Sequence, residues 1–268
     1  MNSGNKIRYY GLFGLFILFG ITTCSNKTDG VRMDASVYYQ KGEEAFKKKR
    51  YEKAIDNFNM VILNSPGGEL ADDAQYYLGE CYFNKKEFLL AVSEYQQVTE
   101  RYSYSPLAEK AYYKVALAYY EQSPKYPLDQ QSTHRALQGF QDFIDTYPNS
   151  ELRPQAEQKI KEIRNKLARK VFESGKLYRK MEQFDSAIIY LDQVLEDYYD
   201  TDWVVFAYLE KAHCYIRLRQ FDQYREMLKM VGRYKQAEDI TKYLHRLDWL
   251  YKKEQQKIAR EEKRKQRR

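Results

Sequence analysis

Apolar residues recur along most of this chain at positions three or four apart, in blocks with the same internal order. This spacing is typical of amphipathic helices, which bury one face and expose the other. Breaks that contain Pro, Gly or Asn separate the blocks, for example at residues 64–68 and 147–150. Because Pro and Gly end helices, the pattern predicts a series of helices joined by turns. An all-α fold is therefore expected.

Small residues mark the places where paired helices are expected to cross. Two of them lie twelve positions apart in three blocks, as Gly42 and Ala54, Gly79 and Ala91, and Gly175 and Ala187. In each block an aromatic residue lies three positions before the alanine, and a large apolar residue lies four positions after it. This arrangement is typical of the tetratricopeptide (TPR) repeat, a helix-turn-helix unit of about 34 residues. A small residue at the crossing lets the two helices approach, and the large residues fill the space beside it.

The pattern predicts a TPR α-solenoid of about five such units across residues 35–235. No unit can bury its apolar face alone, so neighbouring units are expected to stack. The third unit carries extra residues around 123–127, which predict a surface loop between its two helices. Residues 151–181 contain no helix breaker after Pro154 and predict one long helix. In the last unit Tyr224 replaces the second small residue, which predicts looser packing of its two helices.

The first 23 residues predict a signal peptide of the lipoprotein type. A basic start is followed by an apolar run that ends at Ile21 and is shorter than the roughly 20 residues that span a bilayer. Cys24 follows, at the position where a lipoprotein signal is cut and the new N-terminal cysteine receives a lipid. Residues 24–34 would then be a tether between the lipid and the repeats. An ordinary cleaved signal and a short uncleaved anchor are the alternatives.

Positive charge is concentrated at the two ends of the chain. The net charge is +7, but residues 252–268 hold nine Lys or Arg against three Glu, and residues 1–23 hold two basic residues and no acid. The middle of the chain is therefore near neutral, which argues against a nucleic-acid groove. Apolar residues at helical spacing over 240–251 predict that residues 236–268 form a capping helix and a basic tail. The tail is either solvated or in contact with anionic lipid headgroups or an acidic partner.

Residues that could carry catalysis are sparse. The three histidines have no partner at metal-ligand spacing, and the sequence holds no HExxH motif, paired CxxC, Gly-rich phosphate loop or GxSxG. Cys81 and Cys214 lie on predicted helices and are expected to be inert, packed thiols. The sequence therefore predicts a non-enzymatic protein with no metal site and no cofactor besides the covalent lipid on Cys24.

A peptide-binding groove is predicted along the first helices of the first three units. Their fifth and twelfth positions are aromatic, and these positions share one face because they are two helical turns apart. The candidate groove comprises Tyr39, Glu43, Phe46, Tyr76, Glu80, Phe83, Tyr113, Leu117 and Tyr120. Its rings would give an extended peptide a large contact area, and its two glutamates would bind basic or N–H groups. The alternative, that the rings only pack between adjacent helices, stays open.

Parts of the sequence resemble the BamD family, the lipoproteins of the outer-membrane β-barrel assembly (BAM) machinery. The similar stretches are ITTC at 21–24, YEKAI at 51–55 and FQDFIDTYPNS at 140–150. The order of signal, repeats, insertion and long helix is also similar. The resemblance implies a scaffold anchored by Cys24 at the periplasmic face of the outer membrane. Its N-terminal units would bind unfolded outer-membrane proteins and its C-terminal units a BamA-like barrel subunit, with Arg217 and Arg219 as candidate docking charges.

Another periplasmic TPR adaptor is the alternative function, for example a coordinator of cell division that works with the Tol-Pal system. Proteins of that family resemble this chain in their repeats, but they carry an N-terminal coiled coil and no lipidated cysteine. Residues 24–35 show no heptad pattern, and the repeats begin almost directly after Cys24. The sequence therefore favours the BamD-like interpretation.

Overall fold

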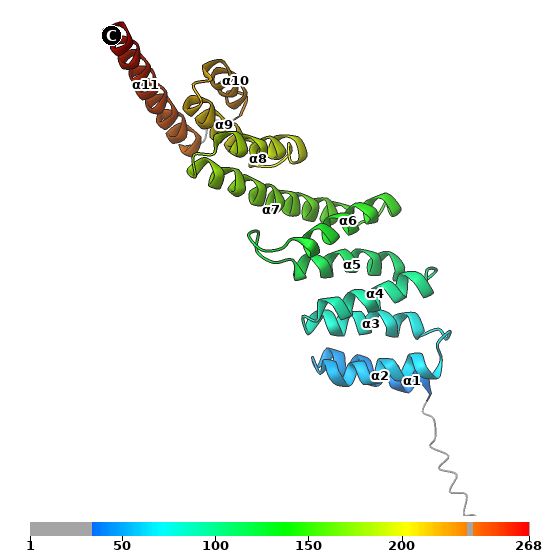
Figure 1. The fold of residues 1–268 in the computed structure, drawn as a ribbon. Helices are drawn as coiled ribbons and strands as arrows, with labels where there is room; N and C mark the ends of the chain where they lie inside the picture. The colour runs from blue at the N-terminus through cyan, green and yellow to red at the C-terminus, as the bar shows by residue number, and fades with distance from the viewer. Residues whose placement is uncertain (1–33, 235–237, 268) are drawn as a thin grey trace, which may run out of the picture. The chain divides into compact units, whose positions relative to one another are not determined.

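The computed structural model describes residues 34–234 and 238–267, and across these residues it contains helices and turns but no strand (Figure 1). The helices are α1 (Ala35–Lys47), α2 (Tyr51–Asn64), α3 (Ala71–Asn84), α4 (Phe88–Arg101), α5 (Ala108–Gln122), α6 (Gln131–Thr146), α7 (Arg153–Lys180), α8 (Phe184–Asp197), α9 (Val204–Arg217), α10 (Phe221–Val231) and α11 (Glu238–Gln266). The expected all-α fold is confirmed. The predicted signal peptide and Cys24 lie outside the described residues.

The helices from α1 to α10 form five consecutive hairpins, and each helix packs against the next one in the chain. This is the predicted arrangement of stacked TPR units. The buried residues accordingly form clusters between neighbouring helices. Tyr76 of α3, Tyr95 of α4 and Ala111 of α5, for example, belong to one cluster that joins the second hairpin to the third. Each hairpin thus depends on its neighbour to cover its apolar face.

The small residues occupy helix crossings, as the sequence predicted. A Cβ atom added to Gly42 would lie 2.7 Å from an aromatic ring of α2, and one added to Gly79 would lie 2.5 Å from the ring of Tyr95. Both distances are far shorter than a van der Waals contact, so a larger residue would push the helices apart. The third hairpin carries Ala116 at this position and compensates on the other helix, where Gly139 lies against it.

The turn between paired helices has one backbone geometry in four of the hairpins. In each of these turns a non-glycine residue adopts a left-handed φ, namely Lys49 (56°), Lys86 (64°), Glu182 (61°) and Arg219 (60°). The N–H of the following residue then donates to a carbonyl five positions earlier, as from Gln220 to Tyr215 at 2.9 Å. This pattern closes the end of the first helix and sets the direction in which the second helix starts.

An inserted loop, residues 123–130, separates α5 from α6 at the predicted position. The buried amide of Gln130 organises it by donating to the carbonyls of Lys125 at 3.0 Å and Leu128 at 2.9 Å. Helix α7 runs without interruption and carries Pro154 in its first turn, where a missing N–H costs nothing. The prediction of one long helix is therefore confirmed.

The last helix, α11, packs against α9 and covers the fifth hairpin. Tyr224 of α10 is buried, and its ring stacks on Tyr251 of α11 with centroids 5.1 Å apart. Ile240 and Leu247 of α11 join the same apolar cluster. The tyrosine that stands in place of the small residue thus has a partner ring on α11. None of the described helices is both long and apolar enough to cross a membrane.

Candidate binding surfaces

The first column of predicted groove rings is largely part of the protein core. Tyr76 is 4% exposed and Tyr113 is 6% exposed, because the second helix of each hairpin covers them. Tyr76 packs against the ring of Tyr95 at 5.6 Å, and Tyr113 packs against Phe140 at 5.5 Å. These two rings therefore stabilise the array and present little surface to a ligand, which corrects their assignment to an open groove.

Tyr39, the first ring of that column, differs from the other two because it is only partly buried. It makes edge contacts with Phe58 at 5.7 Å and Tyr77 at 6.2 Å. Burial, followed by the negative charge of Asp73, raises its hydroxyl pKa, so the side chain is neutral at physiological pH. Tyr39 can thus offer a partner both a ring face and a hydroxyl group.

The second column of rings, at the twelfth position of each unit, stays partly exposed. Phe46 lies 5.7 Å from Tyr51, and Phe83 lies 5.0 Å from the ammonium nitrogen of Lys114. Tyr120 donates its hydroxyl proton to Glu162 at 2.6 Å. These rings are fixed by contacts on one side and retain exposed surface on the other.

The residues at the ninth position have three different environments. Glu80 accepts from the hydroxyl of Tyr95 at 2.6 Å and pairs with Lys114 at 2.7 Å, so its charge is used within the array. Leu117 packs against the apolar cluster of the third hairpin. Glu43 lies near Asp73, whose pKa is raised by burial and then by the negative charges of Asp72 and Glu43. The predicted acidic rim is therefore represented by Glu43 and not by Glu80.

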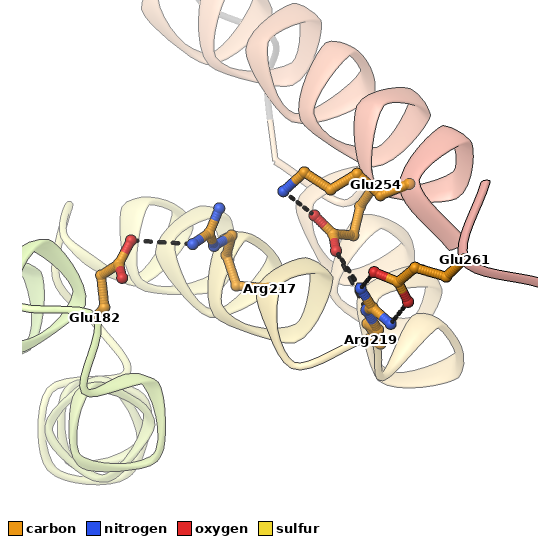
Figure 2. Close-up of polar contacts among 6 residues, drawn as sticks. Glu182, Arg217, Arg219, Glu254 and Glu261 are labelled. Carbon is orange, nitrogen blue, oxygen red and sulfur yellow. Dashed lines mark hydrogen bonds and ion pairs between the residues drawn. The ribbon is translucent and has the colours of Figure 1, made fainter. Parts of the chain in front are cut away.

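The two candidate docking arginines both form ion pairs within the chain (Figure 2). Arg217 donates to Glu182 at 3.0 Å. Arg219 donates to both carboxylate oxygens of Glu261, at 2.8 and 2.9 Å, and to Glu254 at 3.2 Å. Arg219 therefore connects the turn after α9 to α11. The sequence did not reveal this contact because the partner carboxylates lie 35 and 42 positions further along the chain.

A pocket that the sequence did not reveal lies between the inserted loop and α7. Its volume is about 470 Å³, and its walls include Tyr126 of the loop, Trp203 and two basic side chains of α7. The guanidinium of Arg169 lies 4.2 Å from the ring of Tyr126 and 5.6 Å from that of Trp203. Lys166 donates to the hydroxyl of Ser123 at 2.5 Å, and burial lowers the pKa of this lysine.

The wall of this pocket contains cations and aromatic rings but no carboxylate. Such a wall favours a ligand that joins an anionic group to an apolar moiety. Among the described residues, neither Lys166 nor Arg169 lies within ion-pair distance of a carboxylate. From the sequence one could predict only that the loop is an insertion. The pocket itself could not be predicted, because its other wall residues lie about 40 or more positions beyond the loop.

Two curated proteins are similar in sequence to this chain. The outer membrane protein assembly factor BamD of Rickettsia prowazekii is 25% identical over 211 residues, which cover 78% of this chain and 84% of that protein. The protein of the same name from Caulobacter vibrioides is 30% identical over 103 residues, which cover 38% of this chain and 34% of that protein.

Solved structures of TPR proteins align over most of the chain at low identity. The TPR domain of P58(IPK) is 13% identical and aligns over 82% of this chain and 66% of its own, with a TM-score of 0.42. The TPR2AB domain of yeast Sti1, solved in a complex with pHSP90, is 14% identical and aligns over 82% of this chain and 98% of its own, with a TM-score of 0.37.

A family model described as outer membrane lipoprotein, YfiO, matches residues 31–230. The match begins just before α1 and ends one residue before the end of α10, so it takes in all five hairpins and leaves out α11. The two BamD relatives agree with this match. The chain therefore belongs to the YfiO, or BamD, family of outer membrane lipoproteins.

Proposed function

We propose that this protein is a non-enzymatic scaffold and receptor for the assembly of β-barrel proteins into the outer membrane. The observation that carries the proposal is the family match, which extends over all five hairpins. Two relatives in that family are named as outer membrane protein assembly factors. A stack of hairpins suits this task because it exposes a long surface to an unfolded chain while each hairpin stays packed against its neighbours.

The client, an unfolded barrel protein, would bind along the partly exposed rings of the first three hairpins. Tyr39, Phe46 and Phe83 combine exposed aromatic surface with positions fixed by neighbouring rings. Rigid aromatic surface binds extended peptides with a small loss of side-chain entropy. The pocket beside Arg169 would add a site for an anionic group of the client, such as its terminal carboxylate.

The barrel subunit, a BamA-like protein, would dock on the C-terminal hairpins. Arg217 is the better of the two candidate docking charges, because among the described residues it pairs with a single carboxylate, that of the exposed Glu182. Exposed ion pairs contribute little to stability, so a partner's carboxylate could replace Glu182 at low cost. Arg219 is bound by two glutamates of α11 and is less available.

Depletion of the protein, followed by a mass-spectrometric inventory of the outer membrane, tests its role in assembly. We expect the β-barrel proteins to fall several-fold together, while lipoproteins of the same membrane stay constant. Normal barrel levels after depletion would contradict the proposal and favour a different periplasmic adaptor role.

The lipid anchor has a separate test. Mass spectrometry of the mature protein should find an N-terminal Cys24 that carries diacylglycerol and a further acyl chain. No acylated N-terminal peptide should be recovered from the Cys24→Ser variant. A mature chain that starts at Ser25 would contradict lipid anchoring without affecting the assembly role.

Client binding can be measured through Trp203, since the chain has only two tryptophans and Trp249→Phe leaves Trp203 as the sole reporter. A synthetic peptide that copies the C-terminal segment of a barrel protein should change its emission. The effect should weaken about tenfold for the amidated peptide and for Arg169→Met. An unchanged affinity in both cases would remove the pocket from the client site.

A further inference from the structure

The end of α11 lies beyond the span matched by the family model, and its charges are sorted by face. Glu254 and Glu261 are two helical turns apart and therefore share one face, which points at Arg219 (Figure 2). Lys257 also donates to Glu254, at 3.1 Å. The acidic charge on this face is thus compensated inside the protein, by Arg219 of the turn after α9 and by Lys257 of α11 itself.

The opposite side of α11 is mostly basic and carries one large aromatic residue, and Asp248, which pairs with Lys252 at 2.6 Å, lies at its edge. At 100° per residue, Trp249, Lys252, Arg260 and Lys263 all lie about 100° or more from both glutamates. All four side chains are exposed, and Trp249 retains 61% of its surface. Lys253 joins this side, because its ammonium lies 4.7 Å from the ring of Trp249. We call these five residues the basic face.

Packing on α9 fixes the orientation of this face. The buried Leu247 attaches α11 to the apolar cluster of the fifth hairpin, and Glu254 and Glu261 continue the attachment through Arg219. Both contacts lie on the side of the helix away from Lys263. The helix therefore cannot turn its apolar side outward without breaking them, and it presents cations to the surroundings.

We propose that the basic face binds the anionic headgroups of a phospholipid bilayer. Four to eight Lys or Arg clustered on a helix are typical of segments that attach to anionic lipid, and each raises the partition about fivefold. An exposed tryptophan among them matches the preference of its ring for the level of the headgroups. The chain also belongs to a family of outer membrane lipoproteins, so a lipid bilayer is the surface that α11 would meet.

A nucleic acid fits this face less well than a bilayer does. Proteins that bind single strands usually alternate several stacking aromatics with cations along a groove. The basic face carries one aromatic residue, on a single helix, and its cations extend almost four turns beyond that ring.

Vesicle binding tests the proposal with the mature chain from residue 24, carrying Cys24→Ser so that no acyl chain contributes. Vesicles of phosphatidylethanolamine with a third of phosphatidylglycerol should sediment the protein at least tenfold better than vesicles of phosphatidylcholine. In the Trp203→Phe background, Trp249 is the only tryptophan, and its emission should shift to the blue on the anionic vesicles. The difference should shrink in high salt.

The decisive variant combines Lys253→Glu, Arg260→Glu and Lys263→Glu. Its matched control, Lys53→Glu, Lys161→Glu and Lys229→Glu, changes the net charge equally at exposed residues of other helices. We expect the affinity of the first variant for anionic vesicles to fall at least tenfold more than the affinity of the control falls. Circular dichroism should show that both variants are folded. Equal losses, equal binding to the two kinds of vesicle, or tighter binding to polyuridylate than to anionic vesicles would each overturn the proposal. This test does not depend on client binding or barrel assembly.

Discussion

Single small residues decide how closely the helices of a hairpin approach. Gly79 of α3 lies directly against the ring of Tyr95, and an added Cβ would lie 2.5 Å from that ring. Gly67, in the turn between α2 and α3, has no heavy atom within 4 Å of such a Cβ. Substituting alanine at each of these two glycines therefore separates the steric effect of the added methyl at the helix crossing from the effect on backbone flexibility.

Gly79→Ala is expected to lower the free energy of unfolding by about 1–3 kcal/mol, because the added methyl overlaps a fully buried ring. The loss should remain although alanine favours a helix over glycine by about 1 kcal/mol. Gly67→Ala should change stability by less than about 0.5 kcal/mol. Urea unfolding followed by circular dichroism measures both values. Similar values for the two variants would show that the crossing is not tightly packed.

Among the elements, α11 depends on a side chain of the turn after α9. Arg219 binds Glu261 through two parallel hydrogen bonds, and these bonds hold the pKa of Glu261 below its ordinary value of 4.5. A carboxylate with a lowered folded-state pKa stabilises the fold above its unfolded pKa. That contribution is lost as the pH falls through the folded pKa. The contact between Arg219 and Glu261 should therefore act fully at neutral pH and weaken below about pH 4.5.

Arg219→Ala should make amide hydrogen exchange in residues 254–266 several-fold faster, because the far half of α11 then loses its ion pairs with the turn after α9. Arg217→Ala is the matched control, since Arg217 is two positions away and pairs with Glu182 instead. Exchange in α11 should stay unchanged in the control. Equal protection of residues 254–266 in both variants would mean that apolar packing alone positions this helix.

At the scale of the whole helical array, a partly buried histidine couples folding to pH. His213 lies on α9, near charged side chains of α7 and α11. Burial, followed by the positive charges of Arg179 on α7 and Arg246 on α11, lowers its pKa to about 4. The folded protein therefore keeps His213 neutral at pH 6, whereas an unfolded chain has it half protonated at about pH 6.5.

Since the unfolded state binds the extra proton, the free energy of unfolding should fall as the pH drops from 6.5 towards 4. We expect His213 to account for about 2 kcal/mol of that fall after allowance for its partial exposure. Melting temperatures measured from pH 7.5 to 4.5 for the natural protein and for His213→Gln should converge at the acid end. Two parallel curves would exclude His213 as the source of the pH dependence.

The hairpins could be predicted from the sequence because their determinants are local. Gly79 and Tyr95 lie 16 positions apart, within one repeat, and their spacing recurs. The prediction of the groove residues was less accurate, because a ring can contact a ligand only if neighbouring helices leave it exposed. Tyr39 and Tyr76 occupy the same repeat position, yet only Tyr76 is covered by its neighbours. A periodic pattern assigns both to one helix face and does not reveal how deeply the next helix covers each.

The sequence by itself determined the helices, their pairing, the inserted loop and the long α7, because helix periodicity, small residues and chain breaks act over one repeat or less. Only the tertiary structure decided that Arg219 attaches α11, that Tyr224 packs on Tyr251, and that Arg169 lies between two rings. These contacts join residues that are distant along the chain. They depend on where each helix ends and how the next one is oriented, and the path of the whole chain sets both.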